Sequence, residues 1–149
     1  MKRTVSAAII VIGGAVAALL FGPNGPWGGF WRPIAMNPEP AGWQLAGLMS
    51  SGFTEAVGFG LALAILALGR PAFTRLTATP AKATVAQLAS AWLLGSWWPH
   101  TALHMHHGAK ASALVGIELG FHAGSILAAG VLLWAVAATG RRTADPSAV

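Results

Sequence analysis

The sequence predicts an all-α integral membrane protein built as a four-helix bundle, and its composition is the first reason. Of the 149 residues, 9% are charged and 55% are hydrophobic, whereas a soluble domain carries about 25% charged residues. The mean hydropathy is +0.63. So few charges cannot cover a surface in water, so the sequence favours a bilayer environment. A chain of this length has room for one domain.

Four apolar windows are the second reason, because a membrane-spanning helix needs about 20 predominantly apolar residues. They cover approximately residues 4–21, 43–68, 84–107 and 112–139. The first resembles a signal peptide at its basic start, but its apolar run is long and no small-x-small site ends it, so we expect a retained helix. The helices and their loops form one predicted domain over 1–142, followed by a short tail over 143–149.

Basic residues predict the direction of the helices, because cytoplasmic loops are enriched in Lys and Arg. With the N-terminus inside, only Arg32 and Lys110 lie outside. The inner group is Lys2, Arg3, Arg70, Arg75, Lys82, Arg141 and Arg142. We therefore expect cytoplasmic N- and C-termini and a multi-pass protein in a bacterial inner (plasma) membrane. The basic residues flank apolar runs and form no patch with exposed aromatics, so we expect no nucleic-acid partner.

The predicted outer loop over 22–42 is rich in proline and tryptophan. Its prolines exclude a regular helix, and its tryptophans suit the membrane interface. We interpret this loop as an ordered cap on the outer face, with a functional lid as the alternative.

Six ionisable side chains interrupt the apolar windows. They are Glu55, His100, His104, His107, Glu118 and His122. An ionisable group at membrane depth costs at least about 2.5 kcal/mol and is a functional hypothesis by default. At about 100° per residue, the three histidines of the third window share one helix face, and His106 points elsewhere. Counting about 1.5 Å per residue from the outer helix ends puts the group in the outer half of the bilayer.

A metal site explains this set of residues best, because helical bundles build metal centres from inward-facing glutamates and histidines. The chain has no cysteine, and His and carboxylate ligands suit zinc, iron or copper, in a mononuclear or dinuclear site. We therefore predict all six residues as metal ligands. The predicted function is a redox or oxygen-activating membrane enzyme acting on a small or lipophilic molecule.

Two other functions stay open at this point. A b-type haem could take His122 with His100 or His104 as axial ligands in an electron-transfer protein, although it leaves both glutamates unexplained. A metal-ion or proton transporter could pass its ion among the same groups. Residues 100–107 resemble the histidine boxes of integral-membrane di-iron desaturases and hydroxylases over eight positions. The chain lacks the further boxes of those enzymes, so we assign no family.

Structural roles are the remaining alternative for these residues. Glu118 and His122 could bond only each other, Glu55 could be protonated and bonded to a carbonyl, and His100 could bond at the kink of Pro99. His106 and His107 could simply be solvated at the interface. Each reading covers one or two residues and leaves the shared position of the whole set unexplained.

Small residues and tryptophans predict how the helices pack. Gly116, Gly120 and Gly124 form a small-xxx-small series that permits close helix approach. We expect it to receive the first helix, which carries Gly13 and Gly14, with a homodimer contact as the alternative. The tryptophans are interpreted as lipid-facing or interfacial, with cofactor stacking as the alternative for two of them. They are Trp92, Trp97, Trp98 and Trp134.

Overall fold

The computed structural model describes residues 2–32, 41–107 and 111–140, and in this part of the chain all regular structure is helical. The elements are α1 (Lys2–Phe21), the 3₁₀ turn η1 (Gly29–Trp31), α2 (Gly42–Leu68), α3 (Arg70–Leu76), α4 (Pro80–Gly95), α5 (Trp97–His107) and α6 (Ala111–Gly140). The all-α class is confirmed. The predicted tail and part of the outer loop lie outside the described residues.

Three helices are long and apolar enough to cross a membrane. They are α1, α2 and residues Leu114–Ala137 of α6, which correspond to the first, second and fourth predicted windows. Large apolar side chains point away from the chain on these helices; Ile9, Ile126 and Leu133 are 65%, 74% and 71% exposed. Such a surface is stable in lipid, so the structure indicates a multi-pass membrane protein.

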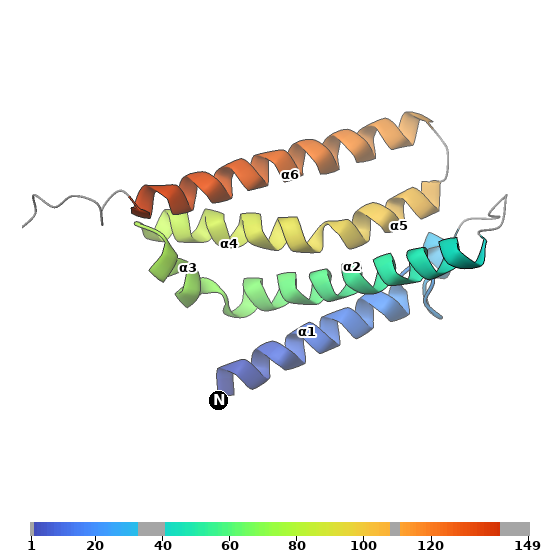
Figure 1. The fold of residues 1–149 in the computed structure, drawn as a ribbon, viewed down its shortest axis with the longest axis horizontal. Helices are drawn as coiled ribbons and strands as arrows, with labels where there is room; N and C mark the ends of the chain where they lie inside the picture. Colours follow the sequence, from blue (N-terminus) through green and yellow to red (C-terminus); the bar gives the residue numbers. More distant parts are fainter. Residues whose placement is uncertain (1, 33–40, 108–110, 141–149) are drawn as a thin grey trace, which may run out of the picture.

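The third window differs from its prediction as one helix over 84–107. It forms α4 and α5, which meet end to end with a bend at Ser96 (Figure 1). Pro99 explains the break, because it has no N–H to donate to the Gly95 carbonyl and its ring crowds the preceding turn. Ser96 still connects the two helices by backbone hydrogen bonds. Its N–H donates to the Trp92 carbonyl of α4 (3.0 Å), and its carbonyl accepts from the His100 N–H of α5 (3.1 Å).

The helices follow one another in a row. α1 packs against α2, α2 against α4 and α5, and these two against α6 (Figure 1). The closed four-helix bundle predicted from the sequence is therefore not confirmed. The short helix α3 was not predicted from the sequence. It connects α2 to α4 at the end of the molecule that holds the N-terminus of α1 (Figure 1).

Small residues bring α1 and α2 together. A Cβ atom on Gly60 would lie 2.2 Å from the Val11 carbonyl oxygen, and one on Gly14 would lie 2.9 Å from the Gly60 Cα. Ala18 and Ala56 are buried in the same contact. Only residues this small let the two backbones approach so closely.

The prediction that α1 packs on the glycine series of α6 is wrong. Because Gly14 fits against Gly60, α1 lies beside α2 and is separated from α6 by the other helices of the row. On α6, Cβ atoms on Gly116 and Gly120 would meet nothing within 4 Å, while one on Gly124 would lie 2.9 Å from the Trp92 ring. The homodimer contact stays a prediction.

Basic side chains bind helix termini at the end of the molecule that holds the N-terminus of α1. Arg3 donates to the Leu68 carbonyl, and Arg70 donates to the Pro80 carbonyl and the Thr84 hydroxyl. This end also contains α3 and the start of α4, whereas the end of α5 and the start of α6 lie at the opposite end (Figure 1). The molecule thus has a basic end and a histidine-bearing end.

Candidate metal centre

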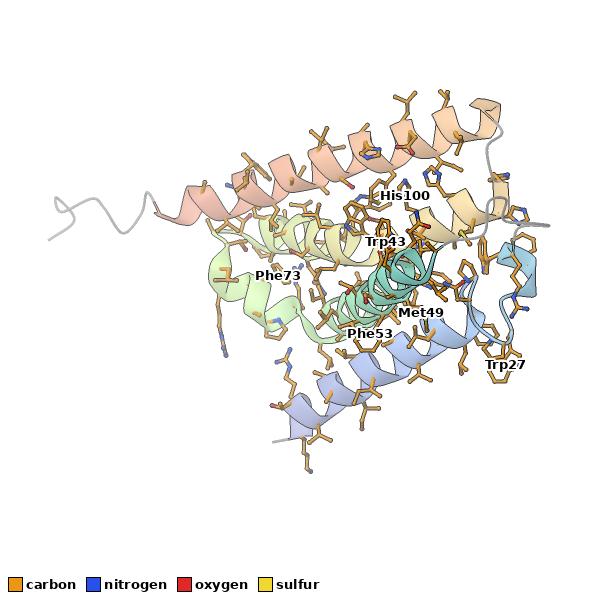
Figure 2. The ribbon with its side chains drawn as sticks, turned by 45° about the vertical axis from the view of Figure 1, so that its right-hand side comes forward. Trp27, Trp43, Met49, Phe53, Phe73 and His100 are labelled. Carbon is orange, nitrogen blue, oxygen red and sulfur yellow. The ribbon has the colours of Figure 1, made fainter. Side chains whose placement is uncertain are left out.

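The histidines of α5 meet the glutamate of α6. His100 lies between the ribbons of α5 and α6 (Figure 2), and its Nε2 is 3.1 Å from His104 Nε2. The same nitrogen of His104 is 2.8 Å from Glu118 Oε1. One donor atom from each of the three residues lies within 4.8 Å of the other two, an arrangement that could hold a metal ion. Predicted ionisable residues from the third and fourth windows therefore do converge.

The spacing of these atoms is close to that of a coordination sphere. Metal–nitrogen and metal–oxygen bonds of about 2.0–2.2 Å place tetrahedral donors about 3.4 Å apart. The two measured separations around His104 Nε2, 3.1 and 2.8 Å, are slightly shorter. A neutral imidazole nitrogen has one hydrogen or one lone pair for its two neighbours. A cation would instead accept one lone pair from each of the three atoms.

His122 positions the glutamate. Its Nδ1 is 2.9 Å from Glu118 Oε2 and 2.9 Å from the Glu118 carbonyl oxygen. Because a carbonyl oxygen only accepts, Nδ1 carries a hydrogen and donates it. The Glu118–His122 pairing left open by the sequence is thus present, but the other carboxylate oxygen reaches His104. Hydrogen bonds of this kind orient metal ligands from outside the coordination sphere.

Aromatic rings pack against the His100 imidazole. Phe121 of α6 stacks on His100 with the ring centroids 3.9 Å apart and an interplanar angle of 15°. Trp97 packs edge-on against Phe121 at 4.7 Å. Phe121 was not predicted from the sequence as a residue of the site. Its position three residues after Glu118, on the same side of α6, was the available signal.

Glu55 lies on the other side of α5. Its Oε1 accepts hydrogen bonds from Ser51 Oγ (3.0 Å) and Thr101 Oγ1 (2.9 Å), beside a small cavity of about 100 Å³. Glu55 of α2 therefore contacts α5 at Thr101 and not at the histidines. In the row, α2 and α6 contact different sides of α5, so the carboxylate of Glu55 does not join the three-residue group. Sequence reasoning missed Thr101.

His106 contacts the outer loop, and His107 packs against His106. His106 Nδ1 donates to the Phe30 carbonyl at 2.7 Å, and its ring stacks on that of Phe30 at 4.5 Å. His107 packs edge-on against His106 at 4.9 Å. Neither belongs to the three-residue group. These contacts connect α5 with η1, so His106 is bonded to the loop and not merely solvated.

The group is open on one side, since the side chains of His104 and Glu118 are 31% and 45% exposed. Two imidazoles and one carboxylate leave coordination positions free, as in catalytic zinc sites and in mononuclear non-haem iron sites. A cation also offsets the cost of a carboxylate beside lipid.

Comparison with known proteins adds no relative. The chain matches no protein-family model, no curated protein and no solved structure. The description of this protein therefore rests on its fold and its site. The chain is a helical protein with three candidate membrane spans and a His/His/Glu group that could hold a metal ion.

Proposed function

We propose that the chain is a multi-pass membrane protein that binds one transition-metal ion through His100, His104 and Glu118. The observation that carries this proposal is the convergence of three donor atoms from two helices within 4.8 Å. His122 positions the carboxylate and acts from outside the coordination sphere. Glu55 is not a ligand in this proposal, because its hydrogen bonds to Ser51 and Thr101 hold it on the opposite side of α5.

The metal lies in the outer half of the membrane in this proposal. α4 and α5 together cover residues 80–107 and form one crossing, the third of four along the chain. The basic end faces the cytoplasm, as the positive-inside rule requires. Glu118 is seven residues into α6, which corresponds to a depth of about 10 Å at 1.5 Å per residue.

The function that this donor set supports best is a redox or oxygen-activating membrane enzyme. Two histidines and one carboxylate with open positions are typical of non-haem Fe(II) sites. The same set also binds zinc with one position open for water or substrate. The exposed side of Glu118 and His104 gives a small molecule access to those open positions.

A proton relay is the second candidate, and one observation favours it. His100, His104, Glu118 and His122 form an unbroken chain of contacts of 2.8 to 3.1 Å. Such a chain can pass a proton without any metal.

Haem is supported less well. A bis-histidine haem has its imidazoles on opposite faces of the macrocycle, and the Nε2 atoms of His100 and His104 are in direct contact at 3.1 Å. A haem held through His122 is the remaining form of the haem alternative, and an optical spectrum of the purified protein tests it.

Elemental analysis and an optical spectrum of the full-length protein, purified in mild detergent, test the proposal. We expect one tightly bound iron, zinc or copper per chain and no Soret band. A Soret band would establish haem. Protein without stoichiometric metal, even after incubation with each ion, would leave the proton relay, which a proton-flux assay in liposomes then measures.

A further inference from the structure

A large groove begins at the metal centre and extends between α2, α4, α5 and α6. Its volume is about 920 Å³, within the range of about 300–1,000 Å³ typical of small-molecule sites. Its walls on α2 and α4 are apolar and include Phe59, Leu63, Leu66, Leu88 and Trp92. His100 lines the groove as well. A molecule in this groove therefore contacts one of the proposed metal ligands.

The wall formed by α6 is open because of two glycines. Gly116 and Gly120 line the groove, and a Cβ atom on either would meet nothing within 4 Å. This differs from Gly14 and Gly60, where neighbouring atoms occupy the space that a side chain would need. The glycines of α6 thus widen a cavity, whereas those of α1 and α2 close a helix contact.

The groove has a polar region on one wall, formed by Ser96 at the junction of α4 and α5 and by His100 and His107 of α5. Ser96 lines the groove and is 8% exposed, yet its hydroxyl oxygen has no hydrogen-bond partner among the described residues. Helical serines normally bond the carbonyl one turn earlier, and a buried hydroxyl without a partner is costly. His100 lies one turn further along. At the junction, this polar region therefore offers the Ser96 hydroxyl and the His100 imidazole to a ligand.

The groove is accessible from lipid. Leu66, Leu88 and Trp92 are 46%, 54% and 43% exposed on the outside of the chain, and the described residues that line the groove include no Lys, Arg, Asp or Glu. A charged ligand would lose its hydration without gaining a counter-charge in such a groove. An uncharged ligand with an apolar body would enter from the hydrocarbon region at little cost.

We infer that this groove binds an uncharged, lipid-soluble molecule with a carbonyl or hydroxyl oxygen at one end, and that this oxygen bonds Ser96 beside His100. The inference deepens the proposed function and rests on it, because it names the substrate class of the same metal site. The apolar body of the molecule would lie along Leu63, Leu88 and the open face of Gly120.

Two probes that differ only in their polar end test the inference. Decyl-benzoquinone has a carbonyl oxygen, and decylbenzene has the same tail without one. Binding of each to the full-length protein in phosphatidylcholine nanodiscs is measured by equilibrium dialysis. We expect the quinone to bind up to about tenfold more tightly, the size of one hydrogen bond to a buried group. The variant Ser96→Ala should remove this difference without changing decylbenzene binding.

A second variant tests the location of the apolar body. Gly120→Leu should fill the groove and weaken both probes at least about tenfold. Gly13→Leu is the matched control, because Gly13 is also open but lies on α1, away from the groove. If Gly120→Leu fails to fold, Gly116→Leu replaces it.

Three results would overturn the inference. Equal binding of both probes, unaffected by Ser96→Ala, would show that the groove accepts acyl chains only. Absence of probe binding would exclude the site, as would a dimer mass in the nanodisc together with exclusion of both probes. Metal content of the same samples separates the two proposals. Metal without probe binding would overturn the groove alone, and probe binding without metal would overturn the proposed metal function alone.

Discussion

The contact between α1 and α2 and the contact between α5 and α6 hold their helices together by opposite means. At the first, the backbones lie so close that neither Gly14 nor Gly60 has room for a Cβ atom. At the second, Glu118 bonds His104 at 2.8 Å across the helix interface, and a stacked phenylalanine supports His100. The first contact is made by close packing of backbone atoms and the second by polar side chains.

The difference follows from the bilayer, which gives two apolar helices no hydrophobic reason to associate. Close van der Waals packing or hydrogen bonding must replace that force. Packing of small residues leaves no space for a ligand. The polar contact places lone pairs within ligand-bond distance of a common point, so it can accept an ion. The contact of α1 and α2 therefore leaves no room for a ligand, whereas the contact of α5 and α6 contains the group that could hold a metal ion.

The variant His104→Ala should show the largest effect. Its Nε2 is the atom that contacts both other donors, so removing it separates His100 from Glu118. We expect metal affinity to fall by more than about 100-fold, since even partners outside the coordination sphere cost about 10–100-fold. Metal titration of the purified protein measures this. His106→Ala is the control, because His106 bonds Phe30 instead. Full metal content in His104→Ala would contradict the proposed site.

The variant Gly60→Leu breaks the other contact. Its side chain would meet the Val11 carbonyl, and a backbone atom cannot move aside as a side chain can. We expect a loss of about 1–3 kcal/mol in stability, seen as a lower Tm in detergent. Gly47→Leu on the same helix is the control, since its Cβ would meet nothing within 4 Å. Equal Tm values for both variants would show that α1 and α2 do not pack as described.

The variant His122→Ala tests the boundary of the coordination sphere. His122 donates to Glu118, so its loss should loosen the carboxylate and lower metal affinity about 10-fold. His122→Asn, whose amide nitrogen can take the place of Nδ1, should recover most of it. Loss of metal as complete as in His104→Ala, without recovery in the asparagine variant, would make His122 a ligand.

The variant Glu55→Gln should have the smallest effect on metal. Its carboxylate bonds Ser51 and Thr101, so metal affinity should change by less than about threefold, no more than the loss of one weak hydrogen bond. Stability should change by about 1 kcal/mol at most. Loss of metal in this variant would return Glu55 to the predicted ligand set.

Much of this molecule was predictable because the signals are local. A membrane-spanning helix must satisfy its backbone within about 20 apolar residues, so α1, α2 and α6 follow from composition alone. The spacing of His100 and His104, and that of Glu118 and His122, fixes which side chains share a helix face. A kink at Pro99 was considered only as a structural role for His100, and the division of the third window into two helices at Ser96 was not predicted.

The arrangement of the helices depended on contacts between distant residues. Periodicity cannot tell which glycine meets which helix, so Gly14 was expected against α6 and lies against Gly60. It likewise cannot tell which side of α5 each neighbour covers, which is why Glu55 reaches Thr101 and the imidazoles meet Glu118. The sequence by itself determined the helices and the faces that carry polar groups. Only the tertiary structure decided which faces meet, because that choice depends on how closely each pair of backbones can approach.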